Sequence, residues 1–179
     1  QGADVAVAHC YAGGSAVAYA PVAEWLRDPA LGSRLAVLDD VWLAEIARIV
    51  PELLAERPHL IVPGPLTEAW QRTRLFEALA RAVLGEVRTP QLLFLDDLQW
   101  CDQETLDWLG YLLRFAARAP LLVVGAVRKY ELGKDHPLIA FWLALTRSGL
   151  LSEIPLAPLD ETDSRLLAAT VAGRPVEAD

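Results

Sequence analysis

Residues 92–102 read Leu-Leu-Phe-Leu-Asp-Asp-Leu-Gln-Trp-Cys-Asp, and this stretch decides the fold. Its first four residues are bulky and apolar without alternation, and Pro90 precedes them. A short unbroken apolar run next to a breaker favours a strand buried on both faces, as in a parallel sheet. The carboxyl end of such a strand is where α/β sheets bind ligands, so Asp96 and Asp97 are candidate site residues. The alternative is a strand that ends in a polar turn, with Asp97 as the cap of the next element, and the dipeptide alone favours neither.

Strands and helices are expected to alternate along the chain. The candidate strands are the apolar segments 3–11, 92–97, 121–127 and 151–156. Helical spacing of apolar residues, or a helix-start signal, predicts helices at 21–26, 42–54, 67–84, 104–115, 138–148 and 163–171. The candidate N-caps are Thr67, Asp102, and either Asp160 or Thr162. This order predicts an α/β fold in which helices cover both faces of a parallel sheet.

The composition narrows the class of protein. Of the 179 residues, 54% are hydrophobic, which argues against disorder. The sequence contains no run of about eighteen apolar residues, the length that a membrane-spanning helix needs. A formal charge of −8 argues against direct binding of nucleic acid by this segment, because phosphate contacts need clustered Lys and Arg. The two cysteines, Cys10 and Cys101, are expected to be reduced thiols of a cytoplasmic protein. No secretory signal is visible. Since the chain starts with Gln and contains no Met, we interpret it as an internal piece of a longer protein.

Two stretches carry a resemblance to a known family. Residues 92–102 resemble the Walker B strand of AAA-like signal-transduction ATPases of the STAND group, the nucleotide switches in the middle of large bacterial regulators of the LuxR and SARP types. The segment 121–128, Leu-Leu-Val-Val-Gly-Ala-Val-Arg, is similar to their sensor-1 strand. Further similarity lies in Tyr-Ala-Pro-Val-Ala-Glu-Trp-Leu-Arg at 19–27 and Pro-Leu-Asp-Glu-Thr-Asp at 158–163. The resemblance therefore covers nearly all of the chain.

The resemblance implies a P-loop ATPase that uses ATP and Mg²⁺. It implies that Asp96 holds the metal ion beside the nucleotide, that Asp97 positions the attacking water, and that Arg128 contacts and senses the γ-phosphate. Residues 1–156 would be part of the ATPase core, and 157–179 would begin a helical lid or linker. Hydrolysis would be slow and would reset a switch in a cytoplasmic protein without membrane contact. Its partners would be nucleotide, other domains of the same polypeptide and, on activation, further copies.

The chain departs from the family at one point. The phosphate-binding loop Gly-x-x-x-x-Gly-Lys-Ser/Thr does not occur in the sequence, and in the family it joins a central strand to a helix that would precede Gln1. The 179 residues alone are therefore expected to be inactive and to bind ATP poorly. An ATPase remnant that serves as an interaction scaffold is the main alternative, since six tryptophans would suit partner surfaces. A phospho-acceptor receiver domain is a further alternative, but it needs another aspartate on a later strand and a lysine near the end.

Overall fold

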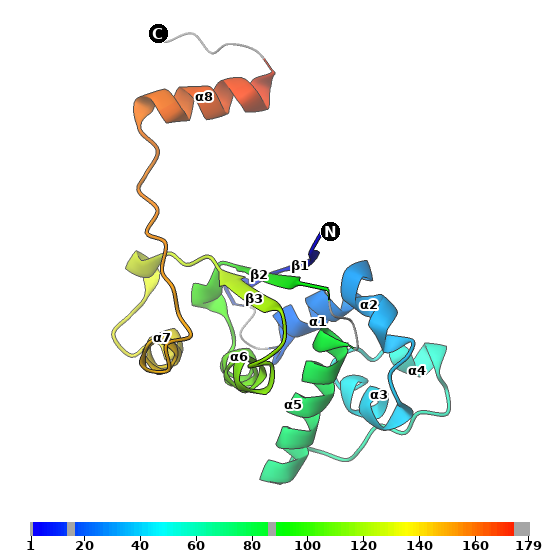
Figure 1. Ribbon diagram of the computed structural model, residues 1–179. Coiled ribbons are helices and arrows are strands. Elements are labelled where there is room, and N and C mark those ends of the chain that lie inside the picture. The colour runs from blue at the N-terminus through cyan, green and yellow to red at the C-terminus, as the bar shows by residue number, and fades with distance from the viewer. Residues whose placement is uncertain (1, 14–16, 86–88, 174–179) are drawn as a thin grey trace.

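The computed structural model describes residues 2–13, 17–85 and 89–173. In chain order the elements are β1 (Asp4–His9), α1 (Ala20–Arg27), α2 (Pro29–Leu35), α3 (Asp40–Ile46), α4 (Leu53–Glu56), α5 (Ala69–Leu84), β2 (Gln91–Asp96), the short 3₁₀ turn η2 (Leu98–Trp100), α6 (Gln103–Phe115), β3 (Leu121–Gly125), the 3₁₀ turn η3 (Lys129–Glu131), α7 (Pro137–Arg147) and α8 (Glu161–Ala172). Helices separate the strands, as the sequence predicts, and α8 stands apart from the rest (Figure 1).

The strands form one parallel sheet in the order β1-β2-β3. His9 lies opposite Asp96 in the register of β1 and β2, and Leu95 lies opposite Gly125 in the register of β2 and β3. All three carboxyl ends therefore lie at the same edge of the sheet. This confirms the α/β class and the predicted parallel pairing, which result from buried apolar strands joined by helical crossovers.

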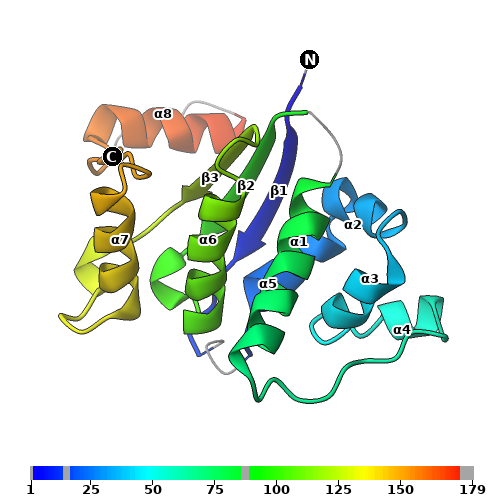
Figure 2. The same ribbon diagram turned by 60° about the horizontal axis from the view of Figure 1, so that its bottom comes forward.

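The core lies between the sheet and the helices α1, α5 and α6, which pack on one of its faces (Figure 1, Figure 2). Leu93 and Leu95 of β2 point into this layer and are 1% exposed. Trp25 of α1 and Trp108 of α6 are fully buried there, with ring centroids 6.3 Å apart. Their indole N–H groups donate to main-chain carbonyls of β2 and α5 at 3.1 and 3.2 Å, so both rings are buried without an unsatisfied donor.

The opposite face of the sheet is open within the described ranges. Val5, Val7 and Leu122 point out of it and are 48%, 40% and 57% exposed. The helical covering that the sequence predicts for both faces is thus present on one face of the described chain. Within the described part of the chain, β3 pairs only with β2, so the other edge of β3 is free. A parallel sheet normally has both faces covered, which makes this surface a place where further structure can pack.

The helix predicted at 42–54 is wrong as a single element. α3 ends at Ile46, residues 47–52 are not helical, and α4 resumes only at Leu53. Pro51 explains the break, because proline has no N–H to donate and disfavours the helical conformation of the residue before it. Leu43, Ile46 and Leu53 are nevertheless buried. The apolar spacing therefore predicted which side chains face the core and not that the helix is continuous.

The strand predicted at 151–156 is also wrong. The segment is an irregular connection towards α8, and Ile154 and Leu156 are 83% and 88% exposed. An apolar run becomes a strand only where a neighbouring strand can pair with it, and the described sheet contains no such neighbour. α8 falls in the segment 157–179 that the resemblance assigns to a lid or linker, of which residues 174–179 lie outside the described part.

Helix starts depend on local caps that the sequence indicates only in part. Asp102 and Asp160 cap α6 and α8 as predicted. Thr67 does not cap α5: Glu68 is the N-cap, and the Gln71 side-chain oxygen accepts from the Glu68 N–H at 2.9 Å. A glutamine at the third helical position can satisfy an N–H that has no partner within the helix, which moves the start by one residue. The short helix α2 is not predicted from the sequence.

Candidate functional site

The carboxyl edge of the sheet brings together the three residues that the sequence singles out. Asp96 ends β2, Asp97 comes directly after it, and Arg128 lies in the segment after β3. Arg128 Nη2 is 3.2 Å from Asp97 Oδ1, which makes an ion pair between the ends of two neighbouring strands. Asp96 and Arg128 thus lie at the same edge of the sheet. Their chemical roles stay predictions.

Asp97 has a backbone conformation that is unusual for a residue with a side chain. Its φ is 52° and its ψ 45°, in the left-handed region, which costs about 1 kcal/mol or more. Two hydrogen bonds fix the turn: Asp96 Oδ1 accepts from the Asp97 N–H at 2.9 Å, and the Leu98 N–H donates to the Ala126 carbonyl at 2.8 Å. The chain therefore leaves the sheet at Asp97 and turns into η2 towards β3. Backbone strain of this kind concentrates at functional sites and supports the choice of Asp97.

Gln99 joins the end of β2 to the segment after β3. Its side chain is 2% exposed, and it lies between the end of β2 and the segment after β3. The amide nitrogen donates to Asp97 Oδ1 at 3.1 Å, while the amide oxygen accepts from the main-chain N–H of Arg128 at 3.1 Å. A buried amide that uses both its donor and its acceptor in this way holds the carboxylate and the backbone at a fixed separation. The sequence does not indicate this bridge, because the bridge depends on the turn at Asp97.

Arg128 has a second acidic neighbour. Glu131 Oε1 lies 3.4 Å from Arg128 Nη1, and the Arg128 side chain is 50% exposed. The Asp97 carboxylate first, and Glu131 second, raise the pKa of the Arg128 guanidinium above its usual value. The site therefore holds a permanent cation with half of its surface open to solvent. Such a guanidinium is able to exchange a carboxylate partner for a phosphate.

Asp102 is a structural residue. It is 5% exposed, and its two carboxylate oxygens accept three hydrogen bonds. Oδ1 accepts from the Thr105 N–H at 2.8 Å and from the Tyr19 N–H at 3.1 Å, while Oδ2 accepts from the Thr105 hydroxyl at 2.7 Å. Asp102 thus caps α6 and ties it to the residue that precedes α1. These partners all come from the protein, so the cap explains this residue without a catalytic role.

His9 and Glu24 add a second ion pair at the same edge. His9 Nδ1 lies 3.0 Å from Glu24 Oε1, and the His9 main-chain N–H donates to Glu24 Oε2 at 3.0 Å. The Glu24 hydrogen bond is the main cause that raises the pKa of His9, and Asp96 and Asp97 contribute in the same direction.

The two cysteines meet beneath the edge. Cys10 and Cys101 are both free and buried, at 4% and 7% exposure. Its hydrogen-bond interaction with Cys10, together with burial, raises the pKa of the Cys101 thiol. A thiol whose ionisation is suppressed reacts slowly, which agrees with a structural role for the pair.

The oxygen donors at this edge suit Mg²⁺, which prefers oxygen ligands and keeps most of its own water. Within the described ranges, the Asp96 side chain makes one hydrogen bond, through Oδ1 to the Asp97 N–H. Its other oxygen is available to a metal-bound water. The same residues contain no cluster of three or more His, Cys, Asp or Glu side chains placed to hold a metal. A magnesium ion here would depend on Asp96, on water and on the phosphates that it accompanies.

The family model for the AAA ATPase domain matches residues 2–124 of this chain. The match includes β1, β2, Asp96 and Asp97 and nearly all of β3, whereas Arg128 lies beyond it. No curated protein and no solved structure matches the chain. Among the described helices, none combines the length and the apolar character that crossing a membrane requires.

Proposed function

This chain belongs to the AAA ATPase domain family, and we propose that it supplies the Walker B and sensor part of a nucleotide switch that uses ATP and Mg²⁺. The switch would be the STAND-type ATPase of a multidomain bacterial signalling or transcriptional regulator in the cytoplasm. The observation that carries the proposal is the meeting of Asp96, Asp97 and Arg128 at the carboxyl edge of a parallel sheet. Two carboxylates and a guanidinium at such an edge are groups that phosphoryl transfer uses together with a phosphate-binding loop.

The two aspartates act differently in this proposal. Asp96, whose second oxygen has no hydrogen-bond partner among the described residues, would hold a magnesium ion through its water, and the ion would neutralise charge on the phosphates. Asp97 orients the attacking water and receives its proton. The Arg128 guanidinium, 3.2 Å from Asp97, turns to the γ-phosphate when nucleotide binds and returns to Asp97 after hydrolysis. This exchange of partners would be the switching event.

The phosphate-binding loop is not among the 179 residues, and we infer that another segment of the same polypeptide supplies it. Two features of the described chain support this inference. The free edge of β3 can accept a further strand, and the open face with the exposed Val5, Val7 and Leu122 can accept a further helix. Both surfaces would be covered in an α/β domain of the usual architecture.

The test compares the 179-residue chain with a longer polypeptide of the same protein that includes a phosphate-binding loop. The short chain should bind ATP–Mg²⁺ weakly and release no phosphate, because its net charge of −8 repels the nucleotide and it lacks the amides and the lysine of the loop. The longer polypeptide should bind ATP–Mg²⁺ and hydrolyse it slowly. Calorimetry measures the first quantity and phosphate release the second. Tight binding by the short chain would show that the site lies elsewhere.

Single substitutions in the longer polypeptide test the assigned roles. Asp97→Asn should lower kcat by about 10²–10⁴ with little change in affinity, since a group that orients water acts mainly in the transition state. Asp96→Ala should weaken the magnesium dependence of binding and of hydrolysis. Asp135→Asn, which changes an exposed aspartate before α7, is the matched control and should alter neither. A longer polypeptide that ignores ATP would favour the scaffold function, for which the 62% exposed Trp70 offers a contact.

A further inference from the structure

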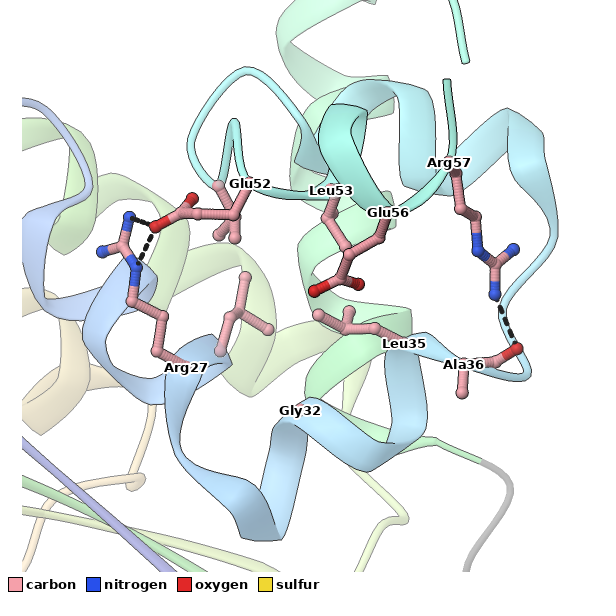
Figure 3. Close-up of a pocket in the computed structure, with 10 residues that line it drawn as sticks. Arg27, Gly32, Leu35, Ala36, Glu52, Leu53, Glu56 and Arg57 are labelled. Carbon is pink, nitrogen blue, oxygen red and sulfur yellow. Dashed lines mark hydrogen bonds and ion pairs between the residues drawn. The ribbon is translucent and has the colours of Figure 1, made fainter. Parts of the chain in front are cut away.

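A cavity of about 470 Å³ lies away from the carboxyl edge, where α1, α2 and the segment 50–57 meet (Figure 3). None of the residues that line it belongs to the group around Asp97. Its size falls within the range of pockets that hold small organic molecules, about 300–1,000 Å³. Its volume would therefore admit a small ligand, and nothing in the proposed nucleotide chemistry uses it.

The floor of the cavity is apolar. Four apolar side chains that are between 1% and 7% exposed line it: Leu26 of α1, Leu35 of α2, Leu53 of α4, and Val50, which precedes α4. These side chains come from separate elements, which the core holds together, so the floor does not depend on one mobile loop. An apolar ligand body placed on it would be removed from water at a gain of about 25 cal/mol for each Å² buried.

The two arginines of the rim already have partners. Arg27 lies 2.8 Å from Glu52, and Arg57 lies 3.1 Å from Asp40 and donates to the Ala36 carbonyl at 2.8 Å. Figure 3 shows Arg27 joined to Glu52 across one side of the cavity and Arg57 directed to Ala36 on the other. Neither guanidinium is therefore free to take an anionic ligand without losing an existing bond.

Glu56 is the exception on this rim. Its carboxylate lies between Leu35 and Leu53 and points into the cavity (Figure 3). Among the described residues it makes no hydrogen bond and no ion pair within 4.0 Å. The cavity thus presents one unpaired negative charge above an apolar floor. A ligand gains from both features only if it carries a cation at one end and an apolar body at the other.

We propose that this cavity binds a small organic molecule with a single ammonium group on an apolar body, the ammonium group pairing with Glu56 and the body lying on Leu26, Leu35 and Leu53. The binding is independent of nucleotide. It can therefore be tested on the 179-residue chain itself.

The probes are n-hexylammonium, hexan-1-ol and hexanoate, which share one chain and differ in the charge of the head group, with n-butylammonium as a shorter cation. Methyl NMR titration of the wild-type chain gives the dissociation constants and the location of binding. The shifts should be confined to the methyls of Leu26, Leu35, Val50 and Leu53. Hexylammonium should bind about two- to fivefold more tightly than hexanol, as expected for an exposed ion pair. Butylammonium should bind more weakly, by about fourfold for each methylene removed.

Three variants separate charge from shape. Glu56→Gln should abolish the preference for the amine over the alcohol and leave hexanol binding unchanged. Glu56→Lys should transfer the preference to hexanoate. Glu161→Gln, at an exposed glutamate of α8, is the control and should behave as wild type. Because Glu56 is exposed, circular dichroism should show that all three fold normally.

Several outcomes would overturn the proposal. Equal binding of hexylammonium and hexanol to the wild type would remove the role of charge, as would a full preference for the amine in Glu56→Gln. Shifts centred on Val5, Val7 and Leu122 would show adsorption to the open sheet face instead of binding in the cavity. Failure of hexylammonium to shift any methyl at millimolar concentration would show that the cavity binds no such ligand.

Discussion

Asp102→Ala should lower the free energy of unfolding by about 3–5 kcal/mol. This value is the sum over the three hydrogen bonds that the Asp102 carboxylate accepts. Loss of the α6 cap, the 2.8 Å bond from the Thr105 N–H, costs about 1 kcal/mol. The Tyr19 N–H, buried and 3.1 Å from the carboxylate, would lose its acceptor at a cost of about 1–3 kcal/mol. The Thr105 hydroxyl, at 2.7 Å, adds about 1 kcal/mol. Domains have a total stability of about 5–15 kcal/mol, so the variant should lose a large part of it.

Equilibrium unfolding in urea measures this loss. The buried Trp25 and Trp108 become exposed on unfolding, so tryptophan fluorescence reports the transition. Asp160→Ala is the matched control. It removes the same kind of cap, a 2.7 Å hydrogen bond that the Asp163 N–H donates, but α8 is exposed and buries no residue. Its effect on global stability should be below about 0.5 kcal/mol. If both variants lose equal stability, or if Asp102→Ala loses none, Asp102 is not the structural tie described above.

Three further outcomes are expected. Glu24→Gln should lower the pKa of His9 towards 6.5 in an NMR titration, since the Glu24 hydrogen bond is the main cause of its elevation. The stabilisation by this pair is complete below pH 6.5 and is lost as the pH rises through the raised pKa of the folded state. An unchanged His9 titration in the variant would refute the role of Glu24. Cys10 and Cys101 should react slowly with a thiol reagent in the native chain and give two free thiols after unfolding without reductant, whereas finding none would show a disulfide. Gln99→Met should cost about 1–3 kcal/mol in urea unfolding, because the Arg128 N–H, which donates to the Gln99 oxygen, is left without that acceptor, and a neutral result would contradict the bridge.

The parallel sheet could be predicted from sequence because an unbroken apolar run is typical of parallel strands, although the described residues cover only one face of this sheet. Leu92 to Leu95 show no alternation, and the same holds for the start of the segment at 121–127, so each indicates a strand of a parallel sheet. Parallel strands joined by a helix have their carboxyl ends at one edge, and this places Asp97 and Arg128 at the same edge of the sheet. Neither argument needs any knowledge of side-chain conformation.

The two wrong predictions of secondary structure have a different origin. The helix predicted at 42–54 and the strand predicted at 151–156 both rest on apolar spacing, which reports burial and not continuity or pairing. Pro51 breaks the first, and the second has no partner strand in the described chain. Gln99 could be predicted only as a possible helper of the site and not as a bridge, because a single glutamine carries no periodic signal. Its position depends on one left-handed residue, Asp97, whose conformation the sequence does not indicate.

That single residue also explains how two adjacent aspartates come to have separate surroundings. Successive side chains of a strand point to opposite faces, so a continuing strand would direct Asp96 and Asp97 away from each other. The left-handed turn instead directs Asp97 towards the segment after β3, where it meets Gln99 and Arg128. Asp96, still in the strand, uses one oxygen to accept the N–H of that turn, and its other oxygen has no partner in the described part of the chain. A carboxylate with a free oxygen suits a metal-bound water, and one fixed between an amide and a guanidinium suits the orientation of a reactant. The proposed division of roles therefore depends on the conformation of the turn, and a substitution that relaxes it, such as Asp97→Gly, should disturb both aspartates at once.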